Sequence, residues 1–167
     1  KLGLDQGILR KVSRVDNPED KKSAILSALK MGTLSGLIIM VVQIAVSRWL
    51  SEEVFDHSSL LTKVIAIHAI SLPFYIIIHI SAFATQGYKL LKFKIFVSEI
   101  QNPLILLLIM ILCYFFYSAE SVIIIPVVIS AVLGCVTISI FLKKVSGVNL
   151  LSVKKGVFDN DLLKYSL

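Results

Sequence analysis

Apolar residues are concentrated in four long stretches of the chain, and polar residues are concentrated between them. A membrane-crossing helix needs roughly 20 mostly apolar residues, because the hydrocarbon core is about 30 Å thick and a helix rises about 1.5 Å per residue. The pattern predicts spans over residues 23–50, 64–86, 100–117 and 121–142. Helices are the only fitting element, because an open sheet would leave unpaired backbone groups in lipid. We therefore expect an all-α fold, a polytopic membrane helical bundle with four transmembrane helices.

Composition agrees with a membrane location. Hydrophobic residues make up 56% of the 167 residues, whereas soluble domains contain about 45–50%. A soluble core built from so short a chain could not bury that much apolar surface. The bilayer therefore has to act as the solvent for much of this protein.

Charged residues orient the four spans. Basic residues are concentrated before the first span, between the second and third, and after the fourth: Arg10, Lys11, Arg14, Lys21, Lys22, Lys89, Lys92, Lys94, Lys143, Lys144, Lys154, Lys155 and Lys164. The two other loops contain Glu52, Glu53, Asp56 and Glu120. We expect a multi-pass protein of the cell (inner) membrane, and the positive-inside rule predicts that its N-terminal segment, second loop and tail are cytoplasmic. Aromatic residues at Trp49 and over 114–117 agree with an outer boundary.

The net charge of +6 needs no nucleic-acid partner, because the basic residues are loop charges that fix topology and contact anionic headgroups. No P-loop, G-x-S-x-G, H-E-x-x-H or paired cysteine motif occurs. Cys113 and Cys135 lie inside predicted spans and are expected to be packing residues. We expect no enzyme, no cofactor and no metal site. No acidic residue lies within a predicted span, so the usual intramembrane carboxylate site is missing from these four stretches.

A polar stripe follows one narrow face of the second span. Its members are spaced by three or four residues: His68, Ser71, Tyr75, His79, Ala82 and Gln86. Such a stripe is costly against lipid, so it should face the bundle interior or a water-filled cavity. The spacing leaves two interpretations open, namely hydrogen bonds that hold neighbouring helices together and the wall of a cavity that faces a solute. Pro73 lies in the middle of this span and is expected to kink it.

The first span has two features of its own. Lys30 shares a face with Ser27 and Thr33; it either extends to the cytoplasmic interface or places a cation at the inner mouth of a cavity, where it would suit a phosphate. Gly32 and Gly36 form a G-x-x-x-G pattern, and Ser130 and Gly134 form a small-x-x-x-small pair in the fourth span. Both patterns allow helices to approach closely.

The ends of the chain carry further expectations. Residues 143–167 mix apolar and charged positions, which suits either a cytoplasmic amphipathic linker at the interface or an ordinary solvated loop. The chain begins without methionine, nothing near its start is typical of a signal peptide, and its last residues read as the start of another membrane helix. We expect an internal fragment of a longer polytopic protein.

Five short segments resemble polysaccharide flippases of the multidrug/oligosaccharidyl-lipid/polysaccharide exporter superfamily. They are the glycine-leucine stretch with its leucine-arginine pair at 3–13, Leu-Pro-Phe-Tyr at 72–75, Ala-Phe-Ala-Thr-Gln-Gly-Tyr-Lys at 82–89, Glu-Ile-Gln-Asn-Pro at 99–103, and Leu-Leu-Lys-Tyr-Ser-Leu at 162–167. In that resemblance the four spans correspond to helices three to six of a transporter with about 12 to 14 helices, built from two lobes. The chain would then supply most of the N-terminal lobe.

The resemblance implies alternating access and the movement of a polyprenyl (pyro)phosphate-linked oligosaccharide from the inner to the outer leaflet. Its implied partners are the bilayer, that lipid-linked oligosaccharide and the missing helices of its own full-length chain. Candidate substrate-binding residues are cationic or hydrogen-bonding: Arg10, Lys30, His68, Tyr75, His79 and Gln86. Two alternatives stay open, a multidrug or cation antiporter of the same superfamily and a non-transporting membrane assembly subunit whose stripe is only structural.

Overall fold

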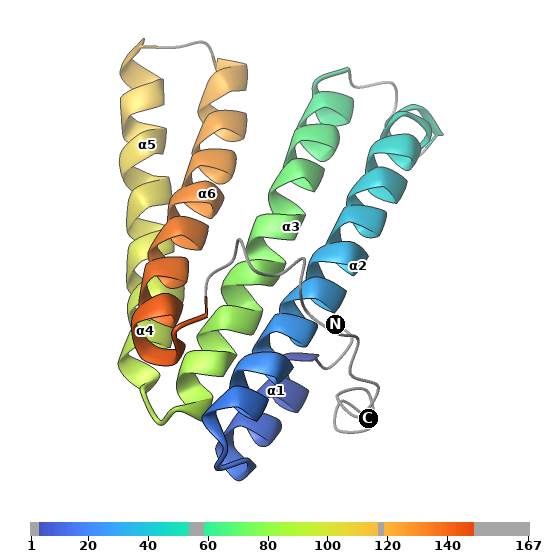
Figure 1. Cartoon of the computed structure of the whole chain (residues 1–167). Coiled ribbons are helices and arrows are strands. Elements are labelled where there is room, and N and C mark those ends of the chain that lie inside the picture. The colour runs from blue at the N-terminus through green and yellow to red at the C-terminus, as the bar shows by residue number, and fades with distance from the viewer. Residues whose placement is uncertain (1–3, 54–58, 117–118, 149–167) are drawn as a thin grey trace.

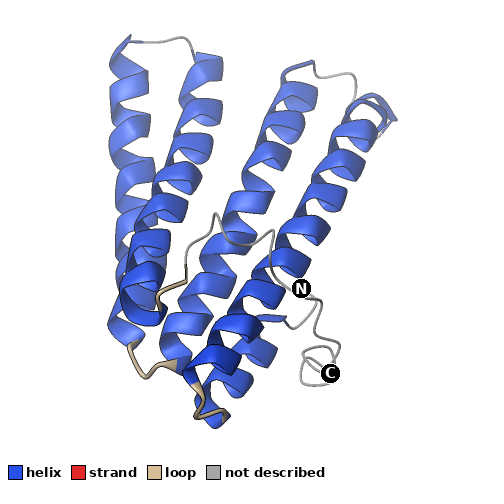
Figure 2. Ribbon diagram, viewed as in Figure 1, coloured by secondary structure: helices blue, strands red, loops and turns tan. Residues whose placement is uncertain are grey.

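The described part of the chain is almost entirely helical. The computed structural model describes residues 4–53, 59–116 and 119–148 (Figure 1). Its elements are α1 (Leu4–Arg14), α2 (Pro18–Glu53), α3 (Ser59–Gly87), α4 (Leu91–Ile95), the π-helical turn η1 (Phe96–Gln101), α5 (Asn102–Phe116) and α6 (Ala119–Ser146). Figure 2 shows helices and no strand in these residues. The all-α prediction is confirmed.

Four of the helical segments are long and apolar enough to cross a membrane, as the pattern predicted. They are Pro18–Glu53, Leu60–Gly87, Leu91–Phe115 and Ile125–Ser146. Each reaches beyond the predicted 23–50, 64–86, 100–117 or 121–142 at one or both ends, because backbone hydrogen bonding continues a helix past its apolar part. The third begins at Leu91 instead of 100, since α4 and η1 run directly into α5. Residues 143–146 of the predicted linker belong to α6, and 149–167 lie outside the described residues.

Two antiparallel helix pairs form the bundle. α2 packs against α3, α5 packs against α6, and α3 and α6 join the two pairs (Figure 1). The short helix α1 lies alongside α2 and α3 at one end of the bundle and contacts both. We call this the α1 end of the bundle and the opposite one the far end.

Buried side chains are concentrated at the α1 end. Ile8 and Val12 of α1 pack with Ile25 and Leu29 of α2 and with Ile80 of α3, all of them buried. A second buried cluster joins α3 to η1 and α6 through Ile78, Ala82, Val97, Cys135 and Ile138. Toward the far end, α2 and α5 instead expose long rows of leucine, isoleucine and valine. Exposed apolar rows of this extent are typical of helices that face lipid.

Glycines set the closest helix contacts, and the G-x-x-x-G pattern of α2 faces α3. A Cβ at Gly32 would lie 2.2 Å from Ile80 Cδ1, and a Cβ at Gly36 would lie 2.9 Å from Ile76 Cδ1 and 3.2 Å from Pro73 Cα. On α6, a Cβ at Gly134 would lie 2.3 Å from Asn102 Oδ1. The missing side chains therefore allow α2 to approach α3 and let Asn102 fit against α6.

The π-helical turn η1 was not predicted from the sequence. It directly precedes α5, whose second residue is Pro103. A proline inside a helix has no N–H and its ring clashes with the carbonyl four residues earlier. A wider turn relieves that clash, and the N–H of Asn102 accordingly donates to the carbonyl of Val97, five residues earlier.

Candidate functional site

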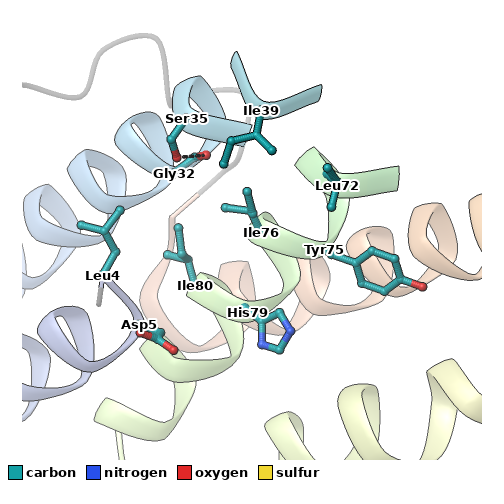
Figure 3. A pocket seen from close by; sticks show the side chains of 10 residues that line it. All are labelled: Leu4, Asp5, Gly32, Ser35, Ile39, Leu72, Tyr75, Ile76, His79 and Ile80. Atoms are coloured by element: carbon teal, nitrogen blue, oxygen red, sulfur yellow. Dashed lines mark hydrogen bonds between the residues drawn. The ribbon is translucent and has the colours of Figure 1, made fainter. Parts of the chain in front are cut away.

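A pocket of about 280 Å³ lies among α1, α2 and α3 (Figure 3). It is lined by Leu4, Asp5, Gly32, Ser35, Ile39, Leu72, Tyr75, Ile76, His79 and Ile80. Its walls are mainly leucine and isoleucine, and four polar side chains interrupt them. Mostly apolar walls with a few placed polar groups are typical of small-molecule sites.

Helix α3 contributes half of the lining residues. They occur at positions 72, 75, 76, 79 and 80, a spacing of three and one that keeps them on adjoining faces of one helix. Tyr75 lines the pocket and also packs against the buried cluster between α3 and α6. The side chain of His79 is exposed, so it stays open to the surroundings of the bundle.

Helix α2 forms the wall opposite. Gly32 allows α2 to approach α3 at this wall, because a side chain at this position would collide with Ile80. The hydroxyl of Ser35 donates to the carbonyl of Gly32 over 2.9 Å, as Figure 3 shows. The same oxygen retains acceptor capacity for a ligand.

Helix α1 contributes an acidic residue that sequence reasoning missed. Asp5 lines the pocket together with Leu4, and its Oδ1 accepts a hydrogen bond of 3.0 Å from the backbone N–H of Gln6. No carboxylate lies within the four predicted spans, so the sequence indicated none for this site. Packing of α1 against α3 brings Asp5 to the pocket that His79 and Tyr75 of α3 also line (Figure 3).

The predicted stripe divides into a packed edge and an open edge. Ser71 and Ala82 are buried, and the Ser71 hydroxyl donates to the carbonyl of His68 over 2.6 Å. That bond lies close to Pro73, whose missing N–H disturbs the backbone ladder here. Tyr75 and His79 lie on the open edge, at the pocket. The Ser71 bond lies within α3, so it does not join this helix to a neighbour.

Gln86, the last residue of the stripe, meets a cation that was not among the predicted site residues. Lys94 Nζ of α4 donates to Gln86 Oε1 over 3.0 Å and lies 3.9 Å from the ring centroid of Phe83. The sequence had placed Lys94 only among the loop charges. Its approach to the stripe depends on how α4 folds back on α3, which spacing within one helix does not indicate.

Three predicted residues lie away from the pocket. Arg10 is exposed on α1, Lys30 is partly exposed on α2, and His68 is exposed on α3 beyond the lining residues. The structure therefore brings Tyr75 and His79 together and places Gln86 with Lys94. It does not join Arg10, Lys30 or His68 to them.

The remaining chemistry near the α1 end is limited. In residues 4–53, 59–116 and 119–148, no three histidine, cysteine, aspartate or glutamate side chains gather to hold a metal. Burial raises the pKa of the Tyr88 phenol, just beyond α3, and the nearby charge of Lys22 partly opposes this. Lys21 Nζ lies 5.3 Å from the same ring. Tyr88 therefore stays a neutral aromatic platform among basic residues at neutral pH.

Comparisons with known proteins add no relative. The chain matches no family model, no curated protein and no solved structure.

Proposed function

We propose that this chain belongs to a membrane transporter that flips a polyprenyl (pyro)phosphate-linked oligosaccharide from the inner to the outer leaflet for surface polysaccharide synthesis. The protein would act without catalysing a covalent reaction. The chain supplies helices of one lobe, and the rest of the transporter completes the path. The resemblance of five segments to polysaccharide flippases suggests the class, and the geometry of α3 supports it.

The observation that carries the proposal is the open polar edge of α3. A diphosphate-sugar cannot cross hydrocarbon unaided, because an unpaired ion or polar group in an apolar medium costs many kcal/mol. Tyr75, His79 and Gln86 offer hydrogen-bonding groups along one helix face, and Lys94 adds a cation at its α1 end. The headgroup would pass along this edge while the apolar tail stays in lipid.

The basic residues support an orientation. Lys21, Lys22, Lys89, Lys143 and Lys144 all belong to the connections and helix termini at the α1 end. Under the positive-inside rule that end would be cytoplasmic and the protein would lie in the cell's inner membrane. Trp49, Tyr114 and Phe115 are exposed at the far end, where an aromatic belt would mark the outer boundary.

Export of glycan by the full-length protein tests the proposal. The double variant His79→Ala with Gln86→Ala removes two groups from the open edge and should lower export strongly at unchanged membrane abundance. Ile70→Ala is the matched control, since Ile70 is exposed on a different face of α3, and it should export normally. Unchanged export by the double variant would assign the stripe to packing and favour an assembly subunit without transport.

One observation favours a second candidate, a drug or cation antiporter of the same superfamily. Such a protein needs a carboxylate beside apolar and aromatic walls, and Asp5 lines the pocket with Leu72, Tyr75 and Ile76. A lipophilic cation would suit that lining. Asp5→Asn separates the two candidates, because it should abolish resistance to cationic drugs in an antiporter and leave glycan export intact in a flippase.

A further inference from the structure

Helix α4 folds back on α3 through a tight turn. The N–H of Lys89 donates to the carbonyl of Gln86 over 2.8 Å, and the N–H of Leu90 donates to the carbonyl of Thr85 over 3.1 Å. Lys89 has a φ of 62°, a left-handed conformation that reverses the chain. As a result α4 starts directly beside the last turn of α3, and Lys94 reaches back to Phe83 and Gln86.

Lys94 differs from its neighbour Lys92. The side chain of Lys94 is partly buried, and its Nζ contacts both Gln86 Oε1 and the Phe83 ring. Lys92 is exposed, and its Nζ lies 5.2 Å from the ring of the adjacent Phe93. Of these two lysines, Lys94 is the one that is positioned against the polar edge of α3.

The partners of Lys94 among the described residues are neutral. An amide oxygen and an aromatic face are both neutral, and among the described residues no carboxylate lies within ion-pair distance of this ammonium. An ammonium has three donor hydrogens, and the bond to Gln86 uses one of them. A cation held by neutral groups beside an apolar helix surface favours an anion, because charge-assisted hydrogen bonds are strong where water is scarce.

Gln86 adds a second donor at the same place. Its Oε1 accepts from Lys94, so its amide nitrogen remains the hydrogen-bond donor of that side chain. A phosphate group has several acceptor oxygens and can accept from an ammonium and an amide together. The ring of Phe83, which contacts the ammonium and packs on the buried cluster of α1, α2 and α3, suits an anion that is attached to an apolar chain.

We infer that Lys94 and Gln86 form a binding site for the phosphate group of a lipid at the α1 end of α3. This inference rests on the proposed function for its physiological ligand, an isoprenoid-linked phosphate. Phosphate chemistry is shared by two sources, that isoprenoid phosphate and the anionic phospholipids of the bilayer.

Binding of dodecyl phosphate to the purified full-length protein in neutral detergent tests the site, with dodecanol as the uncharged control. Wild type and Lys92→Gln should bind dodecyl phosphate alike and more tightly than dodecanol. Lys94→Gln should lose about tenfold or more in affinity, the size expected for one hydrogen bond to a charged group. Lys94→Arg should retain binding, because it keeps the charge.

Equal affinity of Lys94→Gln and wild type for dodecyl phosphate would overturn the inference, and so would equal affinity of wild type for dodecyl phosphate and dodecanol. Competition separates the sources: farnesyl phosphate should displace the probe at lower concentration than phosphatidylglycerol if the ligand is an isoprenoid phosphate, and the reverse order would assign the site to bilayer phospholipid. Glycan export is read separately. Lys94-dependent binding in a protein that exports no glycan would refute the proposed function and leave the phosphate site standing.

Discussion

Helices α3 and α5 are both apolar enough to cross a membrane, yet they differ in how far the other helices of the bundle bury them. In the most apolar stretch of the α3 span, 33% of the residues are buried inside the bundle. The corresponding share for the span that contains α5 is 6%. α3 contacts α1, α2 and α6, while α5 packs mainly on α6. The difference follows from where polar and small residues lie around each helix, because overall hydropathy does not separate the two.

The comparison shows how one helix can serve two purposes. α2 packs closely on α3 at Gly32 and Gly36, and Tyr75 and His79 of the open edge lie on an adjoining face of α3, at the pocket that Gly32 also lines. α5 has leucine, isoleucine and methionine on nearly every exposed face. A helix such as α5 is stable when lipid surrounds it, whereas the open edge of α3 is stable in a membrane only beside water or polar partners.

The largest expected effect is a difference in solvent access between these two helices. Cysteines placed one at a time at 68, 75 and 79 of α3 should react with a membrane-impermeant maleimide, because a transport path would be wet. A cysteine at Leu108, which is exposed in the middle of α5, should stay unreactive because it would lie in hydrocarbon. The measurement is labelling of the intact protein in membranes, in a background without Cys113 and Cys135.

Reactivity at 108 as fast as at 79 would erase the contrast between the helices. Three dry positions on α3 would remove the aqueous path itself, whatever the behaviour of α5. Ile70→Cys is the matched control on α3, since Ile70 is exposed away from the pocket-lining residues and should be as unreactive as position 108.

The second prediction enlarges Gly36 of α2 at its contact with α3. Gly36→Val would place its Cβ 2.9 Å from Ile76 Cδ1 and 3.2 Å from the backbone of Pro73. Overpacking of this kind costs about 1–3 kcal/mol of unfolding free energy. Leu108→Phe, which also adds volume, should change it by less than about 0.5 kcal/mol, because lipid yields around α5.

Denaturation in detergent measures both variants. Ala45→Val controls for helix propensity, since Ala45 is exposed on the same helix as Gly36. Valine is a better helix former than glycine, so a loss of stability in Gly36→Val has to come from the contact with α3. If Gly36→Val were as stable as Leu108→Phe, the close approach of α2 and α3 would not matter for folding.

The fold could be predicted from the sequence because hydropathy and length act along the chain. The four spans needed no tertiary information, and the small residues of α2 were visible as a pattern. That pattern did not say which helix Gly32 and Gly36 would face. The π-helical turn before Pro103 was also missed, since proline signals a disturbed helix without specifying how the backbone adapts.

The candidate site was predicted only in part. Tyr75 and His79 were found because both lie on one helix, where spacing fixes direction. Asp5 and Lys94 were not, because each reaches α3 from a separate short helix. The docking of α1 is set by contacts between residues distant in sequence, such as Val12 against Gly87. The position of α4 is set by the turn at Lys89, whose backbone conformation the spacing within a helix does not indicate.

The smallest expected effect concerns the attachment of α5 to its partner α6. Gln101 Nε2 donates to Thr137 Oγ1 over 2.7 Å, and Thr137 Oγ1 donates to the carbonyl of Leu133 over 3.0 Å. Gln101 Oε1 is buried without a hydrogen-bond partner among the described residues. Gln101→Leu therefore removes a favourable bond and an unfavourable buried acceptor together, and its own effect on stability should be close to zero.

A double-mutant cycle with Gln101→Leu and Thr137→Val isolates the bond between them. Interhelical hydrogen bonds in membranes contribute about 0.6 kcal/mol on average, so the coupling free energy should be of this size and stabilising. Denaturation of the wild type, both single variants and the double variant supplies the four values. Zero coupling would mean that side-chain packing alone holds α5 on α6. A coupling free energy well above this average would mean that a specific hydrogen bond holds α5 on α6, although few residues of α5 are buried. The difference between α5 and α3 in specific contacts would then be smaller.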